Sequence, residues 1–225
     1  MREQLAKELG HGIGISCGGI DGDPQSLWPV ERTAIAKAIP RRQREFAAGR
    51  EAARDAMAQI GWCPEAIPSA PDRSPVWPDG LIGSISHTGR ACVAITGRRE
   101  QVHAMGIDIE EDVALDSTLW ETICTPGELA AMASLHRSER GRWATRLFCI
   151  KEAFYKWQYP QTQRMLDFGD VQVTLNPNQL GFWVQPTGSE TSSLPSCSRE
   201  GRLLTSNGFV LAWLIGPPAS PLGID

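Results

Sequence analysis

The sequence has no long hydrophobic run, and this absence excludes membrane-spanning proteins. Its most apolar segment, Phe209–Ile215, is far shorter than the roughly 20 residues that cross a bilayer as a helix. The segment Met1–Gly14 has no basic region followed by an apolar stretch, so no signal peptide is expected. These absences predict a cytoplasmic protein without a membrane partner.

Cysteine patterns typical of zinc sites and disulfide frameworks are also missing. There is no CxxC pair and no run of Cys and His at zinc-ligand spacing. The scattered cysteines are Cys17, Cys63, Cys92, Cys124, Cys149 and Cys197. Such a distribution favours reduced thiols in a reducing compartment.

The charge balance has no strong excess of either sign. The formal net charge is −4, so the broad basic surface of a nucleic-acid-binding protein is not expected, and any anionic ligand needs a local cluster. Hydrophobic residues make up 41% of the chain and charged residues 21%, which excludes a disordered or coiled-coil protein. A length of 225 residues predicts one large domain or two small ones.

The first half of the chain predicts one helix and three short strands. A helix is expected over residues 40–60, with Pro40 in its first turn and Gly61 at its end. Five prolines make residues 62–80 a loop. Runs at 81–86 and 91–96 predict a hairpin, and residues 12–15 predict an edge strand.

The second half repeats this mixture of helix and strand. Thr125 and Glu128 around Pro126 predict a capped helix start. A longer helix is expected from Glu139 to Gln158, ending before Pro160. Short strands are expected at 171–175, 182–184 and 209–215, and a mobile loop at 187–199. No sequence repeat is evident, but an α+β duplication fits both halves.

A further strand, residues 102–110, carries two carboxylates on one face. Side chains alternate along a strand, so Asp108 and Glu110 share a face with Gly106. We expect the glycine to leave room there for a ligand. Solvated acids on a half-exposed strand are the alternative.

The long helix of the second half has a hydrophobic stripe and a charged face opposite to it. The stripe spans about 80° around the axis and predicts core packing; it consists of Trp143, Leu147, Ile150, Phe154 and Trp157. Glu152 and Lys156 lie on the opposite face, one turn apart. If Glu152 meets Asp108 and Glu110, the three carboxylates suit Mg²⁺, and Lys156 would reach a phosphate on the metal. A surface ion pair is the alternative.

Arginines on the first helix are candidates for phosphate binding. Arg42, Arg50 and Arg54 lie near one another around the axis, and Arg73 follows in the proline-rich loop. A solvated basic face is the alternative, because glutamates are interleaved. His87, at the end of a strand, is a candidate phosphate contact by position alone.

Two of these segments together resemble the signature of the 4′-phosphopantetheinyl transferases. The segments are Gly-Ile-Asp-Ile-Glu at 106–110 and Phe-Cys-Ile-Lys-Glu-Ala-Phe-Tyr-Lys at 148–156, with 43 residues between Asp108 and Glu152. Each is weak alone, but the pair at this separation is specific. Upstream, residues 27–29, 44–50, 73–78 and 83–87 are similar to the subgroup of enterobactin synthetase component D. The resemblance covers about residues 27–215.

The resemblance implies a fold and a reaction. Members of this larger class are pseudo-dimers of two similar α/β halves, here residues 1–103 and 104–225, with coenzyme A in the cleft between them. They transfer the phosphopantetheine arm of coenzyme A to a serine of an apo acyl or peptidyl carrier protein and release adenosine 3′,5′-bisphosphate. Two fused halves imply a monomer.

Residue roles follow from the same resemblance. Asp108, Glu110 and Glu152 would hold Mg²⁺ against the pyrophosphate of coenzyme A. Glu152 would be the base for the carrier serine, and Lys156 would hold the pyrophosphate with assistance from Lys151. Ser86 and His87 would contact phosphates near the cleft. Arg42, Arg50 and Arg73 would bind the nucleotide end, especially its 3′-phosphate. Cys149 is interpreted as a packing residue.

Two other functions fit the residues by themselves. The carboxylate cluster would also suit a Mg²⁺-dependent phosphohydrolase that cleaves coenzyme A or a related nucleotide with water. A non-catalytic module that binds coenzyme A or a carrier protein is the second alternative. The set Asp108, Glu110, Glu152 and Lys156 argues against that module, because pure binding needs no base.

Overall fold

The computed structural model describes residues 1–176, 178, 180–187 and 199–216. These residues form two compact units. The first comprises Met1–Met105 and, at the end of the described chain, Ile215 and Gly216; the second comprises Gly106–Leu214. The predicted mixed α+β fold with two halves is confirmed. The assignment of separate roles to residues 1–103 and 104–225 stays a prediction.

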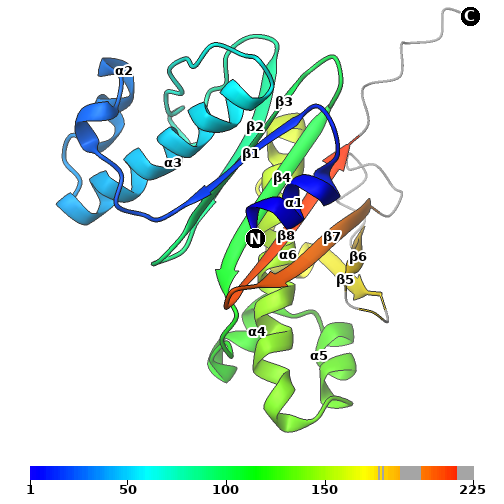
Figure 1. Ribbon diagram of the computed structural model, residues 1–225. Helices are drawn as coiled ribbons and strands as arrows, with labels where there is room; N and C mark the ends of the chain where they lie inside the picture. Colours follow the sequence, from blue (N-terminus) through cyan, green and yellow to red (C-terminus); the bar gives the residue numbers. More distant parts are fainter. Residues whose placement is uncertain (177, 179, 188–198, 217–225) are drawn as a thin grey trace, which may run out of the picture. The chain divides into compact units, whose positions relative to one another are not determined.

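The first unit contains a three-stranded antiparallel sheet with one long helix against it (Figure 1). The strands are β1 (Ile13–Gly18), β2 (Leu81–His87) and β3 (Cys92–Arg98), and the helices are α1 (Arg2–Leu9), α2 (Pro29–Arg32) and α3 (Pro40–Gln59). Short 3₁₀ turns are η1 (Pro24–Ser26) and η2 (Thr33–Ile35). The strand order β1-β3-β2 puts β1 at an edge. The predicted helix, edge strand and hairpin are therefore confirmed.

Close contact between α3 and β1 depends on small residues. A Cβ atom on Gly14 would lie 1.9 Å from the carbonyl oxygen of Ala56, so only glycine permits this approach. Ala53, Ala56 and Met57 are fully buried on the same side of α3. The sheet and helix thereby enclose the core of the first unit, and α3 is held rigidly by its apolar face.

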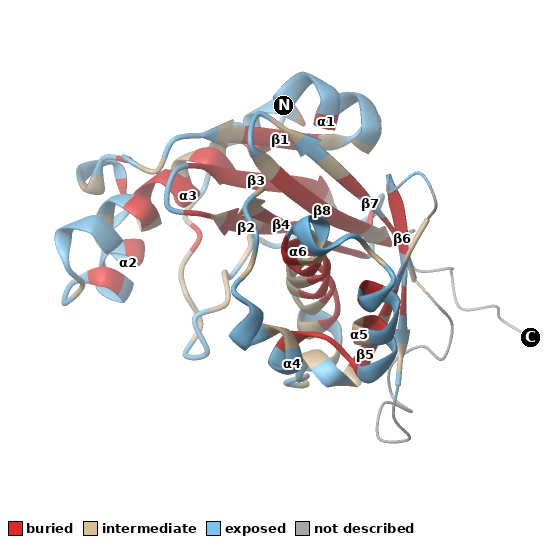
Figure 2. Cartoon of the chain, turned by 90° about the horizontal axis from the view of Figure 1, so that it is seen from below, coloured by how far each residue is buried: buried red, intermediate tan, exposed pale blue. Residues whose placement is uncertain are grey.

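The second unit contains a five-stranded sheet with the order β4-β8-β7-β6-β5. The strands are β4 (Ala104–Glu111), β5 (Val171–Leu175), β6 (Gly181–Pro186), β7 (Arg199–Ser206) and β8 (Phe209–Gly216). The helices are α4 (Trp120–Ile123), α5 (Pro126–Ala133) and α6 (Arg137–Thr162), with 3₁₀ turns η3 (Ser117–Leu119) and η4 (Phe168–Asp170). Figure 2 shows that many residues of α6, β4 and β8 are buried. The hydrophobic stripe of α6 is buried as predicted, except that Trp143 is only half-buried.

Two features of the secondary structure differ from the expectations. Helix α6 does not end before Pro160 but continues to Thr162, with Pro160 inside its last turn. Helix α1 and strand β7 were not predicted, since their sequences have weak hydrophobic patterns. The loop expected at 187–199 lies almost entirely outside the described residues. Within the described residues, none of the helices has the length and hydrophobicity that a membrane span requires.

Candidate active site

Strand β4 and helix α6 approach each other at Gly106. A Cβ atom at this position would lie 2.1 Å from the carbonyl oxygen of Ala153 and 2.5 Å from the backbone nitrogen of Trp157. Gly106 therefore makes room for the backbone of α6, and the expectation that it leaves space for a ligand is wrong. The same approach brings the carboxylates of β4 to the charged face of α6.

Lys156 of α6 pairs with Asp108 of β4. Its Nζ atom donates to Asp108 Oδ1 at 2.5 Å, and the Asp108 side chain is only 3% exposed. Burial lowers the pKa of Lys156, but the charge and hydrogen bond of Asp108 together with the charge of Glu152 oppose it, and the pKa stays above its usual value. The charged face of α6 is thus turned toward the sheet, and the alternative of a solvated surface pair does not describe Lys156.

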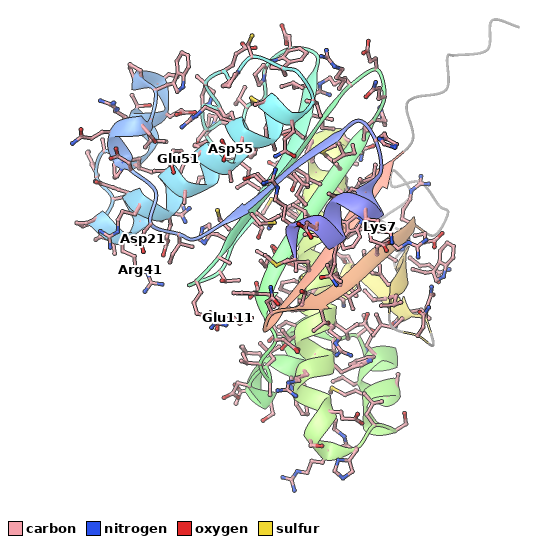
Figure 3. All side chains as sticks on the ribbon, viewed as in Figure 1. Lys7, Asp21, Arg41, Glu51, Asp55 and Glu111 are labelled. Atoms are coloured by element: carbon pink, nitrogen blue, oxygen red, sulfur yellow. The ribbon has the colours of Figure 1, made fainter. Side chains whose placement is uncertain are left out.

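Glu110 and Glu152 complete a cluster of acidic side chains. The pKa of Glu110 is raised to about 7, mainly by burial and then by the charges of Asp108 and Glu152, against the opposing effect of Lys156. Burial also raises the pKa of Glu152, again opposed by Lys156. Glu111 continues the acidic run where β4 ends (Figure 3). Like charges in one partly buried site favour a proton or a cation.

The donor chemistry of this cluster fits a hard divalent cation. Asp108, Glu110 and Glu152 offer only carboxylate oxygens, which are the ligands that Mg²⁺ prefers. Among the described residues, however, no three Asp, Glu, His or Cys side chains are already gathered closely enough to enclose a metal. Mg²⁺ usually retains several ligands from water or substrate phosphates, so an incomplete protein set is consistent with this ion.

A cavity of about 300 Å³ opens beside Glu152. Apolar side chains from α6 and from the chain before β5 line most of it. The lining residues are Lys151, Glu152, Phe154, Tyr155, Met165, Leu166, Asp167, Phe168 and Val171. Tyr155 also donates its hydroxyl to the Sδ atom of Met165 across this region, at 2.7 Å. No sequence pattern indicates this cavity, because its two walls are separated along the chain.

The contacts of Lys151 do not indicate phosphate binding. Its side chain is 1% exposed, and its ammonium donates to Glu128 Oε2 at 2.7 Å and to the carbonyl oxygens of Ile123 and Phe168 at 2.8 Å. An ammonium has three donors, and all three are used. The expected assistance of Lys151 to the pyrophosphate is therefore replaced by a structural role. Glu128 was recognised only as the cap partner of Thr125.

In the first unit, Arg50 is buried in the core side of α3. Its Nε atom donates to the carbonyl oxygen of Ile67 at 2.8 Å, and its Nη2 atom donates to Ser69 Oγ at 3.1 Å. The guanidinium also stacks over the Phe46 ring at 4.2 Å. Burial lowers the pKa of Arg50 to about 10, so the group stays charged at neutral pH.

Arg42 and His87 lie side by side at one end of this unit. Arg42 Nη1 lies 2.7 Å from His87 Nε2, and His87 Nδ1 lies 3.3 Å from the carbonyl oxygen of Thr88. A neutral imidazole protonated at Nδ1 satisfies both contacts, because Nε2 then accepts from the arginine. Ser86, the preceding residue of β2, is buried.

Arg73 lies on an exposed turn with an unusual backbone. Its φ of 71° is in the left-handed region, which non-glycine residues rarely adopt. Asp72 supports the turn by accepting from the Ser74 backbone and hydroxyl. Ser69, which Arg50 contacts, pairs with Pro75 across the same turn. Arg50 and the turn of Arg73 are thus connected, whereas Arg54 pairs with the buried Glu31.

The remaining charges of α3 form ion pairs near its start. Arg41 pairs with Glu45 at 2.8 Å and Arg44 with Asp21 at 3.3 Å. The hydrogen bond from Arg41 holds the pKa of Glu45 below its usual value. Figure 3 labels Arg41 and Asp21 at this end, with Glu51 and Asp55 farther along α3. The alternative of a solvated basic face therefore fits Arg41 and Arg44 but not Arg50.

Comparison with known proteins assigns the chain to a family. The family model described as the 4′-phosphopantetheinyl transferase N-terminal domain matches residues 30–97, and that of the 4′-phosphopantetheinyl transferase superfamily matches residues 104–210. The chain is 34% identical to the 4′-phosphopantetheinyl transferase PptT of Mycobacterium tuberculosis, over 86% of this chain and 88% of PptT. This protein belongs to the 4′-phosphopantetheinyl transferase family. The resemblance inferred from the two signature segments is confirmed.

Other relatives of this transferase agree with the assignment. The 4′-phosphopantetheinyl transferase Npt of Nocardia iowensis is 29% identical over 81% of this chain and 86% of its own length. Enterobactin synthase component D of Escherichia coli is 36% identical over 65% of this chain and 68% of its own length. The protein is an enzyme that transfers phosphopantetheine from coenzyme A to a carrier protein. The hydrolase and the non-catalytic module are not favoured.

Proposed function

We propose that this transferase carries out its reaction with the carboxylates of β4 and the charged face of α6. The observation that supports this proposal is the contact between Asp108 and Lys156, which joins the two signature segments beside Glu110 and Glu152. A serine hydroxyl of the apo carrier protein attacks the β-phosphorus of coenzyme A. The new Oγ–P bond replaces the P–O bond to the nucleotide, and adenosine 3′,5′-bisphosphate leaves.

Glu152 is the proposed base for the carrier serine. A serine hydroxyl is a weak nucleophile at neutral pH, and a positioned base contributes about 10²–10⁴-fold to the rate. Burial raises the pKa of Glu152, which makes it a stronger base than a fully exposed carboxylate. The serine proton would pass to Glu152 directly or through one water. Cys149 is buried and its thiol pKa is raised by burial, so it is not suited to act as a nucleophile.

Lys156 is the proposed partner of the leaving group. Its ammonium is held by Asp108 and would also face the bridging pyrophosphate, where negative charge develops as the P–O bond breaks. Asp108 keeps Lys156 charged and oriented, and we assign it a catalytic role for that reason. Mg²⁺ held by Asp108, Glu110 and Glu152 would neutralise charge on the pyrophosphate.

The cavity beside Glu152 is the proposed place for the pantetheine arm. The arm is a thin chain of amide and methylene groups, and a volume of about 300 Å³ with mostly apolar walls suits it. In this position the phosphorus end of the arm would be next to Glu152. The carrier serine would approach from outside the cavity.

Residues of the first unit are proposed to bind the nucleotide end. The side-by-side pair Arg42 and His87 offers an arginine fork and an imidazole as contacts for a phosphate. Arg50 and Arg73 are assigned to the 3′-phosphate, and Ser86 to a phosphate near His87. A monomer in the cytoplasm is proposed to be sufficient for the reaction.

Intact-mass spectrometry of an apo carrier protein tests the function. Incubation with this protein, coenzyme A and Mg²⁺ should add one phosphopantetheine, and EDTA should prevent the addition. Glu152→Gln should reduce the rate at least 10²-fold while the protein remains folded by circular dichroism. Normal activity of Glu152→Gln would refute its assignment as the base. Release of adenosine 3′,5′-bisphosphate without a carrier protein would instead support the hydrolase.

A further inference from the structure

The residue that precedes Glu152 on α6 belongs to a buried ion pair. Lys151 and Glu128 have side chains that are 1% and 0% exposed, and their charged atoms are 2.7 Å apart. Lys151 is the residue before Glu152 on α6, so the backbone that carries the proposed base also carries this ammonium. A fully buried pair at such a place calls for an explanation, because burying charges is costly unless every polar atom is satisfied.

The charged atoms of the pair form hydrogen bonds to four segments of the second unit. The Lys151 ammonium binds the carbonyl oxygens of Ile123, at the end of α4, and Phe168, in η4. Glu128 Oε1 accepts from the backbone nitrogen of Val173 in β5 at 2.6 Å, and Oε2 accepts from that of Thr125 before α5 at 2.8 Å. One ion pair thereby connects α6 to four other segments.

Two of these anchored segments build a wall of the cavity beside Glu152. The wall contains residues 165–168 and Val171. Lys151 holds this stretch at Phe168, within the wall, and Glu128 holds it at Val173, two residues beyond the wall. The opposite wall is α6 itself, through Glu152, Phe154 and Tyr155. The ion pair therefore fixes the distance between the two walls.

We propose that Lys151 and Glu128 are positioning residues for phosphopantetheine transfer. They hold the segment 165–173 against α6, so that the pantetheine arm is placed with its phosphorus next to Glu152. Neither charged group binds the phosphates of coenzyme A. This inference rests on the proposed placement of the arm in the cavity. It assigns Lys151 an indirect role through the position of the wall, in place of direct phosphate binding.

The two roles predict different behaviour for Glu128. If Lys151 binds the pyrophosphate, then removal of the negative charge of Glu128 should leave coenzyme A binding intact or improve it. If the pair positions the wall, Glu128→Gln should impair turnover, because an amide accepts through only one of its two terminal atoms and one anchored N–H loses its acceptor. Lys151→Met should impair turnover in the same way.

The experiment compares four proteins with an apo carrier protein as substrate: the wild type, Lys151→Met, Glu128→Gln and the double variant. We expect kcat/KM for coenzyme A, per folded enzyme, to fall at least tenfold in each single variant. The kcat/KM of the double variant should be at most about twofold below that of the less active single variant. The reason is that all three variants lose the anchoring of the same wall. The Kd of adenosine 3′,5′-bisphosphate, which lacks the arm, should stay within twofold of wild type.

Arg140→Gln is the matched control. Arg140 lies eleven residues before Lys151 on α6 and also donates to two backbone carbonyl oxygens, those of Leu135 and Ala133. It should melt at a lower temperature but keep its kcat/KM below that temperature. Circular dichroism confirms that each variant is folded during the assay. If Lys151→Met does not fold, Lys151→Gln, which keeps two donors, replaces it.

Two outcomes would overturn the proposal. Full activity of both single variants, as for Arg140→Gln, would make the pair merely stabilising. Weak binding of both coenzyme A and adenosine 3′,5′-bisphosphate by Lys151→Met, with normal activity of Glu128→Gln, would restore direct phosphate binding. A wild-type protein that transfers no phosphopantetheine would instead refute the proposed function itself, so the two failures are distinguishable.

Discussion

Replacing Gly106 by alanine should separate the two segments that carry the candidate active site. The added Cβ would lie 2.1 Å from the carbonyl oxygen of Ala153 and 2.5 Å from the backbone nitrogen of Trp157. Real Cβ atoms do not approach other atoms closer than 3.0 Å, so β4 and α6 must move apart by roughly 1 Å. Both obstructing atoms belong to helix backbone and cannot rotate away as the end of a side chain would.

The magnitude of the effect follows from this displacement. Overpacking in a core costs about 1–3 kcal/mol of unfolding free energy, and contact with backbone atoms places Gly106→Ala at the upper end. Misplacement of reacting groups by about 1 Å lowers rates about 10²-fold. Because Asp108 moves with β4 while Glu152 and Lys156 move with α6, we expect a loss of this size in kcat/KM for carrier modification.

Intact-mass kinetics and urea unfolding of the same preparation measure both effects. Gly18→Ala is the matched control, because a Cβ there has no atom within 4 Å and the residue does not have a positive φ. It should change stability by less than about 0.5 kcal/mol and leave activity unchanged. If Gly106→Ala has the stability and activity of Gly18→Ala, the close packing of β4 on α6 is refuted.

Three further predictions concern stability and thiol reactivity. Glu31→Ala removes the acceptor of Arg54 and of two backbone N–H groups. The free energy of unfolding, measured with urea, should therefore fall by about 3–5 kcal/mol. A loss below about 1 kcal/mol would contradict the buried network. Thr125→Ala removes a helix cap and should cost about 1 kcal/mol by the same method, with no loss contradicting the cap. Burial raises the pKa of Cys17 to about 11, so its alkylation in the folded protein, followed by peptide mass spectrometry, should increase about tenfold per pH unit from 8 to 10. Exposed Cys63 should be modified first, and equal rates for both thiols at pH 8 would contradict this.

Most of the secondary structure could be predicted from local sequence. Helix α3 begins at Pro40 and ends before Gly61, and the hairpin of β2 and β3 follows its two hydrophobic runs. These elements have strong periodicity and clear end signals, which act within a few residues. Helix α1 and strand β7 lack such patterns, because their stability comes from packing partners far along the chain. Pro160 misled the prediction of the end of α6, because the helix continues two residues beyond it, to Thr162.

The sequence by itself identified the family, because the segments around Asp108 and Glu152 resemble its signature. The alternation of side chains along a strand and a helix also predicted which of these residues share a face, whereas their roles stay predictions. The tertiary structure decided which partners those residues have. It turned Lys156 toward Asp108 rather than solvent, filled the space at Gly106 with helix backbone, and buried Lys151 against Glu128. Such contacts join segments far apart in the chain, and no local pattern encodes them.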